Sequence, residues 1–243
     1  MMTTARNVAF CILLILGISY GSFVTLEQNC GRLQNPLFSS PWLAKIRTET
    51  YSEFFCAGSL INERFVLTAA SCIYNQGKLI VRLGEFDGYK KNSNHNYIYE
   101  DIKVRGAIIH RSYFQKNHQN NIGLLRLQED VVYKPHIQPI CIEVNAQKKL
   151  YQSTFRISHP KIQESEKKRW WLCLYWCSSP NTDESPFGLI GSPNTTITEE
   201  IFFQKGILSH NNSDANIYTD VMAFAIDWIL PNALEVDIIV SNP

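Results

Sequence analysis

Short apolar runs rich in β-branched residues recur through the first half of the chain, and they constrain its fold most strongly. Such runs, separated by turn residues, are typical of β-strands. They span residues 42–46, 54–61, 65–70, 79–83, 104–109 and 122–127. Clear helical spacing is found in the residues that precede Pro231, namely Val221, Phe224, Ala225, Trp228 and Ile229. The sequence therefore predicts an all-β fold with a C-terminal helix.

The length and net charge of the chain limit its number of domains and the kinds of partner to expect. At 243 residues it can bury the core of one sizeable domain, whereas two independent domains would be cramped. Its 23 basic and 22 acidic side chains leave a formal net charge of +1, which gives no reason to expect a nucleic acid or an anionic membrane as partner. We expect one domain over residues 41–243, preceded by a short segment over residues 22–40.

The N-terminus has the pattern of a cleaved signal peptide over residues 1–21. Arg6 precedes an apolar run from Val8 to Ile18, and small residues follow it. A transmembrane anchor is the rival interpretation, but this run is about half as long as a helix that crosses a bilayer. The sequence therefore predicts a secreted, extracellular protein without a membrane anchor.

Cysteine usage fits that compartment. Removal of the signal peptide would leave six cysteines: Cys30, Cys56, Cys72, Cys141, Cys173 and Cys177. An even number in a secreted chain favours disulfide bonds. A zinc site is the competing interpretation of Cys173 and Cys177, but no second pair of cysteines or histidines lies at ligand spacing nearby. We therefore expect no metal and no other cofactor.

Two sequons would accept an N-linked glycan in the secretory pathway. They are Asn194-Thr195-Thr196 and Asn211-Asn212-Ser213. Because such triplets are common by chance, they predict glycosylation at Asn194 and Asn211 only weakly.

Several longer strings resemble the chymotrypsin-like serine proteases. Cys56-Ala57-Gly58-Ser59-Leu60-Ile61 is followed by Phe65-Val66-Leu67-Thr68-Ala69-Ala70-Ser71-Cys72, where the family ends in TAAHC. Asn121-Ile122-Gly123-Leu124-Leu125-Arg126-Leu127 is similar to the family's DIALLRL strand, and Ile217-Tyr218-Thr219-Asp220-Val221 to its VYTDV strand. The resemblance covers about residues 41–141 and 206–230, and the arthropod, extracellular branch is the most similar.

The resemblance implies a double six-stranded β-barrel followed by a helix. It also implies a disulfide between Cys56 and Cys72 around the catalytic loop, and another between Cys30 and Cys141. Cys173 and Cys177 remain, and they would pair only if the backbone between them curls tightly.

The second half departs from the family after residue 145. The stretch 145–169 is polar and charged, the family's GWG string is replaced by Ile157-Ser158-His159, and the segment up to Cys177 is shortened. We therefore expect the second barrel to be truncated or degenerate. Trp170, Trp171 and Trp176 crowd this region, either as the core of a rebuilt barrel or as an exposed protein-binding patch.

Two of the three catalytic positions lie within the well-matched strings. The chemistry needs a serine nucleophile, a histidine that moves its proton and an aspartate that orients the histidine. By the resemblance, Ser71 occupies the histidine position, and its hydroxyl cannot accept a proton at neutral pH. Asn121, a neutral amide, occupies the aspartate position. The resemblance therefore implies that the base and its orienting carboxylate are both lost.

The nucleophile position must be found by counting, because the family's GDSGGP string is absent. Counting back from Gly206-Ile207-Leu208-Ser209, which resembles the GIVS strand, aligns residues 188–193 with that string and puts Ile190 at the nucleophile position. The same register makes Glu184 the remnant of the primary-pocket acid and Ser209 part of the pocket wall. A rival register over residues 183–186 offers Asp183 or Glu184 at the attacking position. Neither register supplies a serine nucleophile in its glycine setting.

The remaining machinery is also incomplete. The family's IVGG string is absent between Cys30 and Pro41, and Leu189 stands where an aspartate would pair with the new amino group. The histidines near these positions are His110, His118 and His210. Because the sequence pairs none of them with an activated serine, we expect structural or surface roles for all three. The acidic residues Glu85, Asp87 and Glu100 lie in a loop that binds calcium in some relatives, but we expect them to face solvent.

The sequence predicts a catalytically inactive, secreted serine protease homologue. It would act, if at all, by binding an extracellular protein such as a protease, an inhibitor or another cascade component. One alternative is an active serine endopeptidase with unusual residues, which would hydrolyse peptide esters and react with serine-directed reagents. A second alternative, suggested by the shortened region, is a decayed family member without a molecular role.

Overall fold

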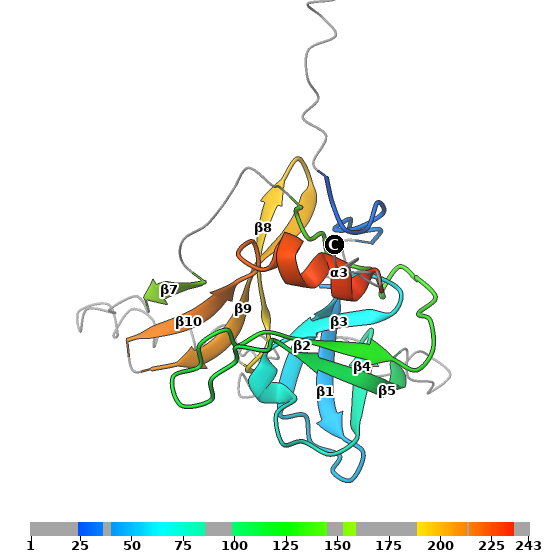
Figure 1. Ribbon diagram of the computed structural model, residues 1–243. Helices are drawn as coiled ribbons and strands as arrows, with labels where there is room; N and C mark the ends of the chain where they lie inside the picture. The colour runs from blue at the N-terminus through cyan, green and yellow to red at the C-terminus, as the bar shows by residue number, and fades with distance from the viewer. Residues whose placement is uncertain are drawn as a thin grey trace, which may run out of the picture.

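The computed structural model describes residues 24–35, 40–85, 99–144, 153–158, 189–212 and 214–235. Within these residues the fold is all-β with a short C-terminal helical segment (Figure 1). The strands are β1 Leu43–Thr48, β2 Cys56–Leu60, β3 Phe65–Thr68, β4 Leu79–Leu83, β5 Glu100–Ile109, β6 Gly123–Leu127, β7 Thr154–Ser158, β8 Pro193–Thr198, β9 Ile201–Asn211 and β10 Ala215–Asp220. The prediction of an all-β protein is therefore confirmed.

The first six strands form a closed antiparallel barrel in the order β1-β2-β3-β6-β5-β4. Each of the six apolar runs in the first half of the sequence coincides with one of these strands, within a few residues at the ends. β5 is longer than its run because residues 100–109 alternate between more buried and more exposed positions, with charged side chains on the outer face. The apolar run begins at Val104, although Ile102 earlier in the strand also packs against the core.

The barrel encloses the main hydrophobic core. Side chains that are at most 1% exposed include Trp42, Phe65, Leu124 and Ile137. Burial of each large apolar side chain stabilises the folded state by about 1.5–3 kcal/mol relative to exposure. The same core includes Ile207 of β9 and Ile229 of the C-terminal segment, so the barrel and the second half share packing.

The other four strands form one sheet in the order β7-β10-β9-β8, which lies beside the barrel in Figure 1. Contacts that join it to the barrel include the hydrogen bond that Ser59 Oγ donates to Gln204 Oε1 at 2.5 Å, and the rings of Trp42 and Phe202, which lie 5.0 Å apart. Both members of the hydrogen bond are buried, so the junction is polar as well as apolar. The closure of a second six-stranded barrel stays a prediction, since the described residues supply four strands.

Two disulfide bonds cross-link the chain. Cys56 pairs with Cys72 over a separation of 16 residues, and Cys30 pairs with Cys141 over a separation of 111 residues. Both pairings implied by the family resemblance are therefore confirmed. Cys173 and Cys177 lie outside the described residues.

The C-terminal segment is helical further than the sequence suggests. A π-helical turn, η4 Ala225–Ile229, leads directly into α3 Leu230–Ala233, which contains Pro231. Pro231 lies in the first turn of α3, where a missing N–H is tolerated, so it does not end the helix as expected.

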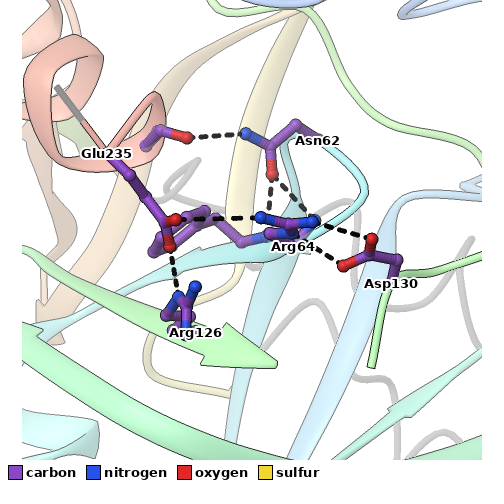
Figure 2. A network of polar contacts seen from close by, with 7 residues as sticks. Asn62, Arg64, Arg126, Asp130 and Glu235 are labelled. Atoms are coloured by element: carbon purple, nitrogen blue, oxygen red, sulfur yellow. Dashed lines mark hydrogen bonds and ion pairs between the residues drawn. The ribbon is translucent and has the colours of Figure 1, made fainter. Parts of the chain in front are cut away.

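A charged network attaches this helix to the barrel (Figure 2). Arg64 Nε and Nη2 donate to the two carboxylate oxygens of Asp130 at 2.7 and 2.9 Å, and Nη1 lies 3.7 Å from Glu235. Glu235 also pairs with Arg126 of β6, while Asn62 Nδ2 donates to Ala233 O at 3.1 Å. These largely exposed ion pairs add little stability individually, but they set the position of the helix end.

Several predictions cannot be compared with the structure. The signal peptide, Glu184, Asp87, the three tryptophans of residues 170–176 and the rival nucleophile register all lie outside the described residues. Within the described ranges, no helix is long and apolar enough to cross a bilayer.

Candidate functional site

Ser71 lies in a short helical turn that follows β3. The strand ends at Thr68, Ala69 is extended, and η1 Ala70–Cys72 then turns the chain. The disulfide from Cys72 to Cys56 of β2 anchors this turn to the barrel. Ser71 itself is half-buried, so its side chain lies at the boundary between the core and solvent.

Asn121 is the centre of the site and is fully buried just before β6. Its Oδ1 accepts a hydrogen bond from the backbone N–H of Ser71 at 2.9 Å. Its Nδ2 donates to Ser209 Oγ at 2.9 Å, Ser209 O at 3.3 Å and Ser71 Oγ at 3.2 Å. One amide therefore connects the turn after β3 to β9 of the second sheet.

These partners fix which end of the Asn121 amide is which. The Ser71 N–H can only donate, so it requires the amide oxygen, and the Ser209 carbonyl can only accept, so it requires the NH₂ group. A carboxylate at this position would face the Ser209 carbonyl with an acceptor instead of a donor. The buried surroundings of residue 121 thus match an amide better than an acid.

A β-bulge positions Ser209. In the β9–β10 pairing, Ile217 lies opposite His210 and Tyr218 opposite Leu208, so Ser209 is the extra residue. Because a bulge breaks the alternation of side chains, neighbouring residues can point toward the same region. Ser209 Oγ contacts Asn121, and His210 Nδ1 lies 3.2 Å from the same hydroxyl.

The sequence paired none of the three histidines with an activated serine, and the structure adds this contact between His210 and Ser209. The two residues are adjacent in the sequence, but the bulge that turns His210 toward Ser209 Oγ has no clear sequence signal. Ser209 is only 1% exposed and already accepts a hydrogen bond from Asn121. It is therefore a buried link in a polar network and not an accessible nucleophile.

His118, from the loop between β5 and β6, lies beside His210 at this site. Its ring stacks on that of His210, with centroids 4.7 Å apart and planes 23° apart. Burial and the neighbouring His118 ring lower the pKa of His210 below its ordinary value. The neutral form of His210 is therefore favoured. Sequence reasoning named both histidines but did not predict their contact.

His110 has a different, structural role. Its ring packs against Phe224 at 5.2 Å and Trp228 at 5.6 Å, both from the C-terminal segment. Burial, with a smaller effect from Arg111, lowers the pKa of His110. This packing agrees with the structural role expected for His110.

Ile190 lies next to the turn that carries Ser71. Its carbonyl oxygen accepts a hydrogen bond from Ala57 N at 2.9 Å and lies 3.4 Å from Cys72 Sγ. The side chain is half-buried and packs against the main hydrophobic core. The structure thus brings Ile190, Ser71, Asn121 and Ser209 into one neighbourhood, although their equivalence to catalytic positions stays a prediction.

Gly191 allows the backbone after Ile190 to lie close to β2 and β3 of the barrel. Its φ of +88° is favoured by glycine, and a Cβ there would lie 2.0 Å from Ala57 O and 2.5 Å from Thr68 Oγ1. Any larger residue would push this segment away from the barrel. Close packing against β2 and β3 therefore requires a glycine at residue 191.

The polar contacts described among the residues of this site are hydrogen bonds. Among the described residues, no histidine ring is recorded within hydrogen-bond distance of Ser71, and His210 faces Ser209. No described group of three or more histidine, cysteine or acidic residues could hold a metal ion. Glu85 pairs with Lys45 and Arg82, and Glu100 pairs with Lys134, so two of the acidic loop residues are committed to cations.

Other predicted positions lie apart from this group. Asn194 is half-buried in β8 and Asn211 is exposed at the end of β9, and glycosylation at both stays a prediction. A cavity of about 260 Å³ lies beside the network of Figure 2, lined by Leu26, Glu27, Arg64 and Glu235 among others. None of its lining residues belongs to the candidate site.

Comparisons with known proteins agree with this architecture. The family model described as Trypsin matches residues 31–168, more than half of the chain. Serine protease grass of Drosophila melanogaster is 32% identical over 138 residues, which cover 51% of this chain and 36% of the relative. CLIP domain-containing serine protease B9 of Anopheles gambiae is 34% identical over 146 residues, covering 52% and 34%.

Vitamin K-dependent protein C of Rattus norvegicus is 36% identical over 104 residues, which cover 42% of this chain and 21% of the relative. The chain thus spans at most 36% of the length of these three relatives. The family match, the closed first barrel and the two disulfides lead to one conclusion. The chain belongs to the chymotrypsin/trypsin-like family of serine proteases.

Proposed function

We propose that this chain is a secreted, catalytically inactive serine protease homologue that acts by binding an extracellular protein. The partner would be a protease, an inhibitor or another component of a proteolytic cascade. The relatives from Drosophila melanogaster and Anopheles gambiae are serine proteases by name, so the proposal concerns a change of role within the family.

The observation that carries the proposal is the buried amide of Asn121. Its NH₂ group donates to Ser209 and Ser71, and its oxygen accepts from the Ser71 N–H, so every polar atom of the side chain is used in holding the structure. A catalytic carboxylate would instead orient an imidazole and stabilise its positive charge. An amide with these partners supports a structural role for the site.

The side chains at the other two positions support the same proposal. The Ser71 hydroxyl is not a base at neutral pH, and Ile190 has no nucleophilic atom. Loss of even one essential member of a serine-protease triad lowers turnover by about a million-fold. Three unsuitable residues would leave no useful hydrolysis.

The alternative is an active peptidase, and one contact favours it. His210 Nδ1 lies 3.2 Å from Ser209 Oγ, which is the distance of a nucleophile–base pair. Against this alternative, Ser209 is 1% exposed, so a peptide carbonyl cannot reach its hydroxyl without rearrangement of β9. A decayed member without a role is a third candidate, and it predicts poor secretion of aggregated protein.

A labelling experiment tests these proposals. The protein would be secreted from insect cells, purified as a monodisperse species and incubated with a fluorophosphonate probe and a panel of peptide esters. Trypsin is the positive control, and the Ser209→Ala variant is the matched control for the alternative. We expect no labelling and no hydrolysis above that of buffer.

Labelling of the native chain would contradict the proposal. If the label disappeared in Ser209→Ala, the nucleophile would be Ser209 and the alternative would be correct. A triple variant, Ser71→His with Asn121→Asp and Ile190→Ser, measures whether restoring the three side chains restores reactivity. Recovery of labelling in it would support the assignment of all three positions.

A further inference from the structure

The loop between β5 and β6 carries two positive charges that no described carboxylate pairs with. Arg111 and Lys116 are exposed, and neither forms an ion pair within the described part of the chain. No aspartate or glutamate occurs from His110 to Asn121. Other barrel cations, such as Arg82 and Lys103, are paired with carboxylates. The loop is therefore a local source of positive potential.

Aromatic rings lie in and beside this loop. Phe114 is 51% exposed and Tyr74, three residues after Ser71, is 40% exposed. Tyr74 contacts Tyr113 of the loop in a T-shaped arrangement, with ring centroids 5.9 Å apart. Exposed aromatic and arginine side chains are enriched among the residues that dominate binding at protein interfaces. Charge and apolar area thus occur together at this place.

The loop is also rigidly folded. Tyr113 N donates to His110 O at 2.8 Å, and Phe114 N donates to Gln119 O at 3.0 Å. Asn120 Nδ2 donates to Ser112 O at 2.9 Å, which closes the loop across its base. A surface that is already ordered loses less conformational entropy when a partner binds.

We infer that Tyr74, Arg111, Phe114 and Lys116, here called the basic loop surface, bind an acidic segment of a protein partner. The inference rests on the proposed function, since it names the contact by which a non-catalytic homologue would act. Two unpaired cations attract carboxylates and speed their encounter, while the two rings supply contact area. The surface adjoins the candidate site, because Ser71 and His118 belong to the same two segments.

Fluorescence anisotropy tests the inference with defined probes. The full chain would be titrated into a fluorescein-labelled peptide of Glu-Glu-Tyr repeats, and into a Lys-Lys-Tyr peptide as the matched control. Two double variants separate the contributions: Arg111→Glu with Lys116→Glu for charge, and Tyr74→Ala with Phe114→Ala for contact area. Arg32→Glu with Arg156→Glu makes the same change in net charge at exposed residues elsewhere.

We expect the acidic peptide to bind at least about tenfold more tightly than the basic one, and the Arg111/Lys116 variant to lose about tenfold in affinity. Added salt should weaken binding, and the Arg32/Arg156 variant should change it less than about twofold. Equal binding of the two peptides, or equal loss in both charge variants, would overturn the inference.

The outcome is separable from that of the proposed function. Hydrolysis or fluorophosphonate labelling by the native chain would contradict the non-catalytic role, whatever the anisotropy shows. Absence of peptide selectivity in an unlabelled, monodisperse protein would overturn the basic loop surface alone. Circular dichroism of each variant confirms that a loss of affinity does not result from unfolding.

Discussion

The two halves of the molecule differ in how the edges of their β-sheets are paired among the described strands. In the first half, six strands close into a barrel, so every strand has two hydrogen-bonded neighbours. In the second half, the described strands form an open sheet of four, with β7 and β8 each paired on one side. Closure completes the backbone pairing of the first half, although its core also includes residues of the second half such as Ile207.

The candidate site lies at the junction of these halves and takes residues from both. Ser71 and Asn121 come from the closed barrel, while Ser209 comes from β9 and Ile190 from the segment before β8. The barrel residues are held by a disulfide and by buried hydrogen bonds. Ser209 reaches them through the amide of Asn121, and Ile190 through the hydrogen bond that its carbonyl accepts from Ala57 N. The contacts that join the halves at this site therefore include the hydrogen bonds of Asn121 to Ser209.

The largest expected effect is the loss of unfolding free energy when each of the two disulfides is removed. In a chain-entropy view, a cross-link stabilises more when it closes a longer loop. Cys30–Cys141 closes a separation of 111 residues and packs against Phe203 of the sheet, whereas Cys56–Cys72 closes only 16 residues within the barrel. We expect Cys30→Ala with Cys141→Ala to lower the free energy of unfolding by about 4–5 kcal/mol, and Cys56→Ala with Cys72→Ala by about 3 kcal/mol.

Urea unfolding followed by tryptophan fluorescence measures both values. Equal costs for the two pairs would mean that the reduced, unfolded chain keeps structure that already brings Cys30 near Cys141.

A large-to-small change in each half tests how far stability is concentrated in the barrel. Phe65 of β3 is 1% exposed, and Phe65→Ala should cost about 3–5 kcal/mol because it leaves a cavity among closely packed neighbours. Ile197 of β8 is 59% exposed, and Ile197→Ala should cost less than about 1 kcal/mol. Chemical denaturation gives both differences. A cost at Ile197 close to that at Phe65 would mean that a partner segment covers β8.

The first half was readable from sequence because each of its strands contains a short apolar run, and each of the six runs became a strand. The disulfide partners followed from the family resemblance and were confirmed. The bulge at Ser209 and the stacking of His118 on His210 could not be predicted, because both depend on a register shift between β9 and β10. The bounds of the C-terminal helix were missed because Pro231 occupies a position where proline is tolerated.

Asn121→Asp should destabilise the junction between the halves by about 1–3 kcal/mol. The substitution removes the NH₂ donor that faces the Ser209 carbonyl and places a charge at a fully buried position. The matched control is Asn117→Asp in the neighbouring loop, where an exposed carboxylate can still accept from Gln119 N. Thermal and urea unfolding of the two variants measure the difference. No loss of stability in Asn121→Asp would mean that the site accommodates the catalytic acid without strain.

The smallest expected effect is a pH dependence carried by the histidines. Burial lowers the pKa of His110 and of His210 in the folded protein, so between the folded and the unfolded pKa the unfolded chain binds more protons. Stability is therefore fully present above the unfolded pKa of about 6.5 and falls as the pH drops below it, until the folded groups also take up protons.

Two variants measure how much of this loss of stability comes from His210 and how much from His110. His210→Gln should flatten the decrease in unfolding free energy between about pH 7 and pH 5, because glutamine does not titrate there. His110→Gln should flatten it as well, but it also removes ring contacts with Phe224 and Trp228 and so lowers stability at every pH. Urea unfolding across this range distinguishes the two. If His210→Gln left the slope unchanged, His210 would titrate alike in both states, and its contact with Ser209 would not depend on the neutral ring.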